Sequence, residues 1–436
     1  MLTFNKIRNL LLSLSIIICI ASDKDTNKYD IPAFYQSHFN KKLSLLSTYE
    51  KNMGSKGDSF IFITDTHVGA NRMTSASLMR GICTNSGINK VFFGGDVITA
   101  HGSKEDLYNQ VNKQLTTYDD YLKPYATIYN TRGNHDFIIC SSAKDTVGYT
   151  APYEVIYRFF MKDLENKVNQ DLDNPNSLYY YHDNQSAKIR YIHLDACEDS
   201  TTSVVCMGIG YGLSQSQYNW LIKTLQSLPA NWNVIILSHI PITSQLAGQK
   251  RASFYSPLKG LLEAFQNAST YNYSGTIGGF TLNINVDFKT NTSKIICILG
   301  GHLHKDRQRY ENGILHIVTA CDAYYSQDGI KRTKGTVNES CLDACLVDIN
   351  SRVLRFVRFG AGYNRIYHYN NPLYTSVGGI KQITSELTGT LTYLSSDKTK
   401  ATVSDTGVIT GIVQGSVMIT AIDANNNKEF FEVKIQ

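Results

Sequence analysis

The residues best suited to chemistry are aspartates, histidines and one asparagine that occur in five short clusters. In chain order these are Asp65-Thr66-His67, Gly95-Asp96, Gly133-Asn134-His135-Asp136, Ser238-His239 and Gly301-His302-Leu303-His304. Carboxylates and imidazoles together suit borderline divalent ions such as Zn, Mn or Fe. Few chemistries need this mixture, and the foremost is a pair of divalent ions that activates water against a phosphate ester.

The clusters also suggest separate roles for their members. Two ions about 3.5 to 4 Å apart need a shared ligand, and an aspartate can bridge them. Asp96 is the natural candidate, because Gly94 and Gly95 before it let the backbone approach closely. Asn134 offers a neutral oxygen ligand, and His135 beside it is placed to donate a proton to a leaving group. A bridging water with a lowered pKa would attack phosphorus in line.

Predicted strands precede nearly all of these clusters. Apolar runs predict strands at 59–64, 90–93, 126–129, 189–194, 234–237 and 295–299, and helical patterns fall at 41–51, 75–83, 104–121, 152–167, 214–225 and 257–267. This alternation predicts a largely parallel α/β sheet, in which ligands bind beyond the carboxyl ends of the strands. One Asp-x-His or Gly-Asp turn is weak evidence, but five clusters in order at strand ends leave little room for coincidence.

The pattern changes in the last third of the chain. From residue 313, strands joined by turns are predicted at 314–318, 341–347 and 353–358, and we expect them to form a second sheet that completes a layered core. After residue 372 the composition shifts to Thr, Ser, Gly and Val without any helix signal. Residues 377–436 therefore predict a small all-β module.

The N-terminus predicts export. Lys6 and Arg8 precede an apolar run at 10–20, and Ala21 ends it, which is the pattern of a signal peptide over 1–21, followed by a lead-in at 22–57. The run is shorter than the roughly 20 residues needed to span a bilayer. No later segment reaches that length uncharged, so we expect no transmembrane span in the mature chain and a secreted or cell-surface location. Lipid attachment at Cys19 and an uncleaved anchor are the alternatives.

Charge limits the kinds of binding partner that we expect, and cysteine content indicates whether disulfides can form. The net charge of +5 comes from 42 basic and 37 acidic residues without any basic run, so no nucleic-acid tract is expected. Eight cysteines remain after the predicted signal peptide, an even number that permits disulfides. Cys197 with Cys206, and Cys341 with Cys345, are near neighbours in sequence, whereas Cys297 lies in an apolar run and reads as a buried thiol.

With these motifs, residues 59 to 369 resemble the calcineurin-like metallophosphoesterase superfamily, and the segment 359–365 is also similar to its secreted bacterial members. The resemblance implies a four-layer α-β-β-α double-sheet sandwich, here over 58–371, with a dinuclear metal site. It also implies the roles of individual residues: Asp65, His67 and His304 at the first metal; Asn134, His239 and His302 at the second; Asp96 between them; and His135 beside the leaving group.

Departures from the family pattern reduce the number of family branches to which the chain could belong. Thr99 stands three residues after Asp96, where purple acid phosphatases carry a tyrosine ligand and protein Ser/Thr phosphatases carry a second aspartate. Both branches are therefore disfavoured. Arg72, His101 and Arg132 are candidate substrate contacts, and for each arginine a surface or structural role is an equal alternative. His193, in a predicted buried strand, reads as a core histidine.

The C-terminal module has its own resemblance. Segments 394–397, 401–404, 407–411 and 415–421 are similar to a bacterial Ig-like repeat of group 2. The usual first strand is missing or is supplied by 380–383, and Tyr393 stands where a tryptophan is usual. Such modules act as spacers or adhesive domains, which implies contact with a cell surface or carbohydrate.

Taken together, the sequence predicts an exported, dinuclear-metal-dependent phosphoesterase that hydrolyses phosphate monoesters or diesters through a metal-bridging hydroxide. The alternative is a catalytically weak surface-binding or adhesion protein that works through its Ig-like module. A missing metal ligand would favour that alternative, and none of the expected ligands is missing. The loops at 140–153 and 196–213 show no pattern that identifies the substrate.

Overall fold

The computed structural model describes residues 30–99, 103–136, 138–139, 149–150, 153–198, 212–247, 255–324 and 330–436. The expected signal peptide with Cys19, and His101, lie outside these residues. Within the described part of the chain, none of the helices combines the length and apolar character that crossing a membrane requires.

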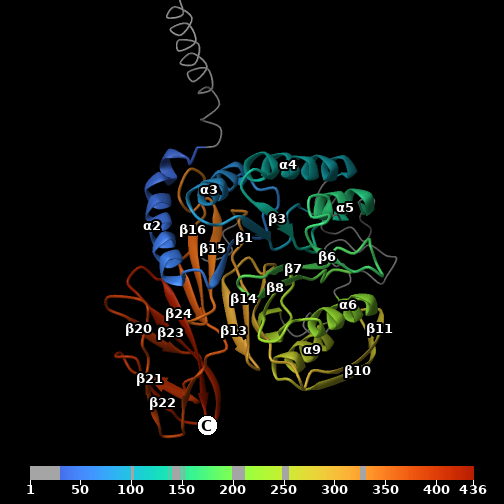
Figure 1. The fold of residues 1–436 in the computed structure, drawn as a ribbon. Coiled ribbons are helices and arrows are strands. Elements are labelled where there is room, and N and C mark those ends of the chain that lie inside the picture. The colour runs from blue at the N-terminus through green and yellow to red at the C-terminus, as the bar shows by residue number, and fades with distance from the viewer. Residues whose placement is uncertain are drawn as a thin grey trace, which may run out of the picture.

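Two β-sheets form the centre of the molecule (Figure 1). The first has ten strands, in the order β20-β23-β24-β17-β16-β15-β1-β2-β3 with β18 beside β24. The second has seven strands, in the order β13-β14-β12-β9-β8-β7-β6. The double-sheet α/β architecture expected from the sequence is therefore confirmed, and an all-β module follows it.

The bounds of the first sheet are β1 (Gly57–Ile63), β2 (Lys90–Phe93), β3 (Thr127–Asn130), β15 (Cys341–Asp348), β16 (Val353–Gly360), β17 (Arg365–His368), β18 (Leu373–Thr375), β20 (Thr392–Ser395), β23 (Gly415–Ile422) and β24 (Lys428–Ile435). Those of the second are β6 (Asn169–Gln170), β7 (Tyr180–Asn184), β8 (Ile189–His193), β9 (Asn233–Leu237), β12 (Lys294–Gly300), β13 (Arg307–Glu311) and β14 (Ile314–Val318). Smaller sheets contain β4 (Ile138–Ile139), β5 (Tyr149–Thr150), β10 (Thr270–Ile277), β11 (Phe280–Asp287), β19 (Ile380–Gln382), β21 (Ala401–Val403) and β22 (Val408–Gly411).

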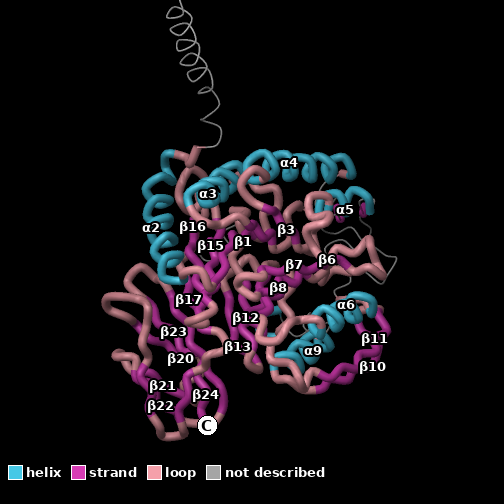
Figure 2. The backbone as a smooth tube through the Cα atoms, in the orientation of Figure 1, coloured by secondary structure: helices cyan, strands magenta, loops and turns pink. Residues whose placement is uncertain are grey.

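Helices cover the outer faces of both sheets (Figure 2). The first sheet is covered by α2 (Gln36–Met53), α3 (Arg72–Asn85) and α4 (Lys104–Leu122), with the short 3₁₀ helix η2 (Ala33–Tyr35) before α2. On the side of the second sheet lie α6 (Gln215–Gln226), α9 (Ser256–Gln266) and the β10–β11 hairpin. The remaining helices are α5 (Tyr153–Met161) and α7 (Ser244–Ala247). A capping box between Ser103 and Asp106 begins α4.

Aromatic side chains fill the space between the sheets. Phe60 and Phe92 of the first sheet stack with ring centroids 4.5 Å apart, and Tyr191 of the second sheet meets Phe92 edge-on at 5.1 Å. The Tyr191 hydroxyl donates to Asp58 at 2.6 Å, and Lys90 pairs with the same carboxylate. The layers are thus joined by large apolar area whose polar tips are paired.

Two histidines lie in this aromatic layer. His193 is fully buried, stacks on Tyr180 at 4.5 Å and bonds Thr131 through Nδ1, as a core histidine would. His182 stacks between Tyr129 at 4.0 Å and Tyr191 at 5.0 Å. Their neighbours are ring faces rather than carboxylates, so nothing nearby favours a charged imidazole.

One expectation about the sheets is wrong. The strands predicted from residue 313 onward do not form a sheet of their own. β14 lies parallel to β12 in the second sheet, whereas β15 extends the first sheet antiparallel to β1, and β16 follows antiparallel to β15. All three strands are buried along their whole length, so their apolar runs mark them as strands without indicating which partner covers them.

The C-terminal module is joined to the first sheet by backbone pairing. β24 runs antiparallel to β23 inside the module and parallel to β17 outside it, from Arg365 opposite Lys428 to Tyr367 opposite Phe430. Residues 380–382, the candidate first strand, pair with β22. In Figure 1 the module, in red, lies below α2 at the edge of the sheet. The module therefore extends the sheet of the larger domain.

Candidate metal centre

The five clusters meet where the strands of the two sheets end. Asp65 and His67 follow β1, Asp96 follows β2, Asn134 and His135 follow β3, His239 follows β9, and His302 and His304 follow β12. The loops also bond one another directly: Asp65 N donates to Gly95 O at 2.9 Å, and Gly301 N to His239 O at 3.2 Å. Both sheets therefore contribute to a single site.

Two groups of possible metal ligands form this site. Asp65, His67 and His304 make one group, and Asp96, His239 and His302 make the other; in each, one ligand atom per residue lies within 4.8 Å of the rest. His304 Nε2 is 3.1 Å from Asp65 Oδ1 and 3.2 Å from His67 Nε2. This spacing suits ligand atoms that face one ion.

The two groups are adjacent. His239 Nε2 lies 3.1 Å from Asp96 Oδ2 and 4.0 Å from Asp65 Oδ1, so one imidazole borders both carboxylates. Asn134 Oδ1 lies 2.8 Å from His302 Nδ1 and adds an amide oxygen to the second group. The structure thus brings together all seven residues that the sequence assigned to metals.

Backbone carbonyls orient two of the imidazoles. His67 Nδ1 is 3.3 Å from Ile98 O, and His239 Nδ1 is 2.7 Å from Gly94 O. A carbonyl at Nδ1 selects the tautomer with its proton there and leaves Nε2 as a lone-pair donor, the usual arrangement around protein-bound metals. In both residues Nε2 is the atom that points into the site.

The electrostatics of the site also fit divalent ions. Burial alone would raise the pKa of Asp65, but the facing His239 and His304 lower it to about 2. Burial lowers the pKa of His239, yet Asp96 and Asp65 outweigh it and raise the pKa to about 9. His239 Nε2 is also a buried atom that makes no hydrogen bond among the described residues. Two ionised carboxylates amid imidazoles that can release protons are a donor set for cations.

The loops that carry the ligands have strained backbones. Asp65, His67, Val68, Asp96, His302 and His304 all adopt positive φ, between 44° and 72°. This conformation is uncommon outside glycine, and a β-branched valine at 52° is an outlier. Glycines supply close approach beside them: a Cβ at Gly133 would clash with the Asp96 carboxylate, and one at Gly301 with that of Asp65. Strain of this kind persists where surrounding bonds enforce it.

His135 lies at the edge of the site. Its side chain is 18% exposed, and its Nε2 is 3.9 Å from Asp96 Oδ2. Its backbone N–H donates to Asp96 Oδ1 at 2.8 Å, which fixes the residue beside the central carboxylate. The imidazole is therefore partly open to solvent while its backbone is anchored.

The three candidate substrate contacts have different placements. Arg132 forms an ion pair with the buried Asp195 at 3.2 Å. Arg72 donates through Nε to Thr117 Oγ1 of α4 at 3.1 Å, so its head group lies against that helix. His101 lies outside the described residues. Neither arginine is among the residues that form the two ligand groups.

Asp136 is a structural residue of the site for which no role was predicted. Its buried carboxylate accepts backbone N–H bonds from Gly133, Asp96, Val97 and Ile98, at 2.8 to 3.2 Å. It therefore holds the whole turn that carries Asp96. Its place directly after His135 was visible in the sequence, but the turn that it holds lies some 40 residues earlier, and no spacing pattern reveals such a contact.

Comparison with known proteins gives two family matches. Residues 59–306, more than half of the chain, match the family model described as calcineurin-like phosphoesterase. Residues 377–433 match that of the group 2 bacterial Ig-like domain. No curated protein matches this chain significantly.

Among solved structures, the chain is similar to a dimetal phosphatase from Danio rerio, with 14% identity and a TM-score of 0.46 over 71% of this chain and 98% of that one. A phosphopantetheinyl hydrolase from Mycobacterium tuberculosis shows 10% identity and a TM-score of 0.35, over 62% and 91%. GAP50, the anchor in the inner membrane complex of Plasmodium, shows 13% identity and a TM-score of 0.41, over 69% and 84%.

Proposed function

The chain belongs to the calcineurin-like phosphoesterase family and is a metal-dependent phosphoesterase, and from that premise we propose that it hydrolyses phosphate monoesters or diesters with two divalent ions. The observation that carries the proposal is the pair of adjacent ligand groups around Asp65 and Asp96. Borderline ions such as Zn, Mn or Fe suit a set of imidazoles and carboxylates without thiolates.

In this proposal Asp65, His67 and His304 hold one ion, Asn134, His239 and His302 hold the other, and Asp96 is shared between them. When bound, the two ions would supply an activated water and neutralise the charge that develops on the phosphoryl oxygens. The protein fixes the Asp65 carboxylate beforehand: Thr64 Oγ1 donates to Asp65 Oδ2 at 2.8 Å, and His302 N to the same oxygen at 3.0 Å. These bonds leave little reorganisation for the reaction itself.

We assign the general acid role to His135. Its imidazole is partly exposed, and its Nε2 lies 3.9 Å from Oδ2 of the shared Asp96, within reach of the departing oxygen of an ester bound there. A histidine there can give its proton to that oxygen and lower the barrier to bond cleavage. The candidates Arg72 and Arg132 bond Thr117 and Asp195 instead, which favours structural roles for both.

Export is the second part of the proposal. Its support is the N-terminal pattern of Lys6 and Arg8, the apolar run 10–20 and Ala21. A secreted or cell-surface phosphoesterase would carry its Ig-like module outside the cell, available for contact with a surface or a carbohydrate. Cell fractionation together with N-terminal sequencing of the mature protein tests this part, and a chain that begins at Met1 in the cytosolic fraction would contradict it.

A direct assay tests the reaction. Purified protein is stripped with a chelator, reloaded with Mn, Zn or Fe, and offered aryl phosphate monoesters and diesters. We expect hydrolysis only with metal, and its loss in Asp96→Asn. His135→Ala should lower kcat by about 10²- to 10⁴-fold, the usual contribution of a general acid. Wild-type protein that hydrolyses neither ester class with any of the ions would contradict the proposal, and the ratio of the two rates assigns the ester class.

A further inference from the structure

Gln114 of α4 joins two of the loops that form the metal centre. Its Nε2 donates to Val97 O at 2.6 Å and to Thr66 Oγ1 at 3.1 Å. Thr66 lies between Asp65 and His67, and Val97 directly follows Asp96. The amide is only 1% exposed, so solvent does not compete for these bonds. A residue outside all five clusters thus bonds two residues, Thr66 and Val97, that adjoin three proposed ligands.

The two loops already pair through their backbones. Asp65 N donates to Gly95 O, His67 N to Asp96 O and Val68 N to Val97 O, at 2.9 to 3.2 Å. Val97 O also accepts from Thr66 Oγ1 at 3.0 Å. The Gln114 amide is the third donor on that carbonyl and bonds both partners of the Thr66–Val97 contact. It thus links the two loops to each other and to α4.

These loops need such restraint because their conformation is strained. Asp65, His67 and Val68 in one loop and Asp96 in the other have φ between 44° and 52°. Residues other than glycine keep this conformation only where their surroundings enforce it. Asp136 restrains the Asp96 turn through its N–H groups, and Gln114 restrains the same turn through the carbonyl of Val97.

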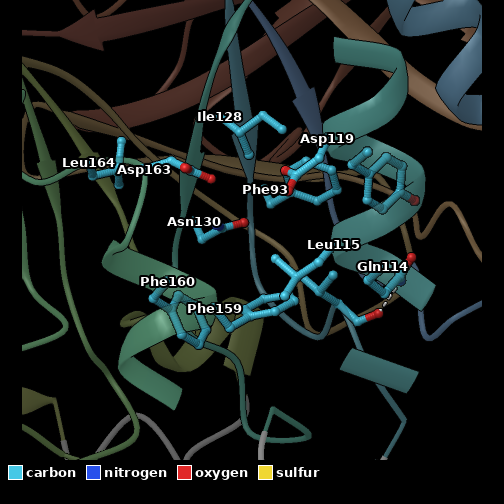
Figure 3. Close-up of a pocket in the computed structure, with 12 residues that line it drawn as sticks. Phe93, Gln114, Leu115, Asp119, Ile128, Asn130, Phe159, Phe160, Asp163 and Leu164 are labelled. Atoms are coloured by element: carbon cyan, nitrogen blue, oxygen red, sulfur yellow. Dashed lines mark hydrogen bonds between the residues drawn. The ribbon is translucent and has the colours of Figure 1, made fainter. Parts of the chain in front are cut away.

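Stability alone does not account for an amide at this position. Among the described residues, Gln114 Oε1 is a buried acceptor without any hydrogen bond, which is a cost. The Thr66–Val97 bond would remain if Gln114 were apolar. An apolar side chain would also find apolar neighbours, because Gln114 borders a small cavity of about 30 Å³ whose lining includes Leu115, Phe159 and Phe160 beside the polar Asp119 and Asp163 (Figure 3).

We propose that Gln114 is a positioning residue that sets the distance between the two metal sites. Its amide clamps the loop of Asp65 and His67, ligands of one ion, to the turn of Asp96, which both ions share. The proposal rests on the dinuclear site proposed above. Without the clamp, the two loops can separate, and the ion pair should bind more weakly although the fold persists.

The test is a metal titration of Gln114→Met with Gln266→Met as its matched control. Gln266 is also a buried helix glutamine, but it is fully bonded, to Gly313 O, Asn370 Oδ1 and Ile295 N at 2.7 to 2.9 Å, and it lies outside the metal centre. We expect Gln114→Met to weaken Mn²⁺ binding to the metal-free protein at least tenfold, as the loss of outer partners of metal ligands does. Gln266→Met should lower Tm more than Gln114→Met does, and it should leave Mn²⁺ affinity unchanged.

A second pair of measurements separates positioning from general stability. Thr66→Val removes the other end of the clamp without changing its volume, so the effects of Thr66→Val and Gln114→Met on Mn²⁺ affinity should be less than additive. Ester hydrolysis by Gln114→Met should recover at high Mn²⁺ with KM for the ester unchanged, since the substrate contacts are intact.

The outcomes are distinct. Folded Gln114→Met that binds Mn²⁺ as tightly as wild type would overturn the proposal, and so would wild-type protein that binds fewer than two ions. Wild-type protein that binds two ions but cleaves no ester would contradict only the proposed function, because the titration still decides the role of Gln114.

Discussion

Two buried clusters of carboxylates lie near each other in this molecule and are neutralised in different ways. In the metal centre Asp65 and Asp96 face imidazoles. In the second cluster Asp306 and Asp343 face two guanidiniums: Arg358 bonds both carboxylates at 2.8 Å, and Arg365 bonds Asp343 at 2.5 Å and Asp306 at 3.0 Å. Arginine keeps its charge at every relevant pH, so the second cluster is neutral without any ion.

The difference separates a structural cluster from a functional one. Imidazoles can lose their protons and turn lone pairs toward an incoming cation, which guanidiniums cannot do. The arginine cluster instead joins elements: Asp306 lies two residues after His304, and Arg358 N donates to Asn364 Oδ1. Asn364 N donates in turn to Asn427 of the C-terminal module. The imidazole cluster can therefore bind a cation, whereas the arginine cluster connects the loop of His304 to the C-terminal module.

Removing one charged member of each cluster would test the comparison, and the larger effect is expected at Asp96. Asp96→Asn should abolish detectable hydrolysis, a loss beyond the roughly 100-fold that follows the change of a mere outer partner. Without metal its Tm should fall only slightly, because His239, whose pKa Asp96 raises, can release its proton once that carboxylate is neutral. Ester assays with calorimetry of the metal-free protein check both halves. A metal-free Asp96→Asn protein that is strongly destabilised would show that Asp96 is structural.

The arginine cluster should respond in the opposite sense. Arg358→Met leaves Asp306 and Asp343 with Arg365 alone and should cost about 3–5 kcal/mol of unfolding free energy, as breaking a buried ion pair does. The folded fraction should still bind Mn²⁺. Urea unfolding measures the loss, and Arg352→Met is the control, since Arg352 is exposed and should change stability by no more than about 0.5 kcal/mol. Equal losses for the two variants would contradict the structural role.

Acid should distinguish the histidines of the core from those of the metal centre. Burial lowers the pKa of His182 to about 3, and it also lowers the pKa of His193. A pKa lowered in the folded state means that the unfolded chain takes up protons first, so stability is lost as pH falls below about 6.5. At pH 5 the cost should be about 2 kcal/mol for His182, at roughly 1.4 kcal/mol per pH unit.

Unfolding by urea at pH 7 and pH 5, with metal saturating, measures this loss. His182→Phe keeps the stack on Tyr129 and Tyr191 but cannot be protonated, so it should lose about 2 kcal/mol less than wild type over that interval. The same pH dependence in His182→Phe and wild type would show that the core histidines do not titrate on unfolding. The pKa of His239 is shifted in the opposite direction from that of the core histidines, because Asp96 and Asp65 raise it to about 9.

The sequence predicted the convergence of the five clusters because each ligand is coded locally, as a polar residue placed at the end of an apolar strand. It did not reveal the residues that restrain those ligands. Gln114 and Asp136 act on the 95–98 turn from sites 17 and about 40 residues along the chain, and such contacts leave no periodic trace. For the same reason the sheet membership of β14 was mistaken, and the pairing of β24 with β17 was not foreseen.

The smallest effect is expected when the strained loop is compared with a regular strand of the module. Val68 and Val403 are both half-buried, but Val68 has φ of 52° whereas β21 around Val403 is extended. Val68→Gly loses apolar contact yet relieves a left-handed conformation worth about 1–2 kcal/mol, so its net change should lie within about 1 kcal/mol. Val403→Gly loses contact without any relief and should cost about 2 kcal/mol. Thermal unfolding of both variants measures the difference, and equal losses would mean that the metal loop stores no strain at Val68.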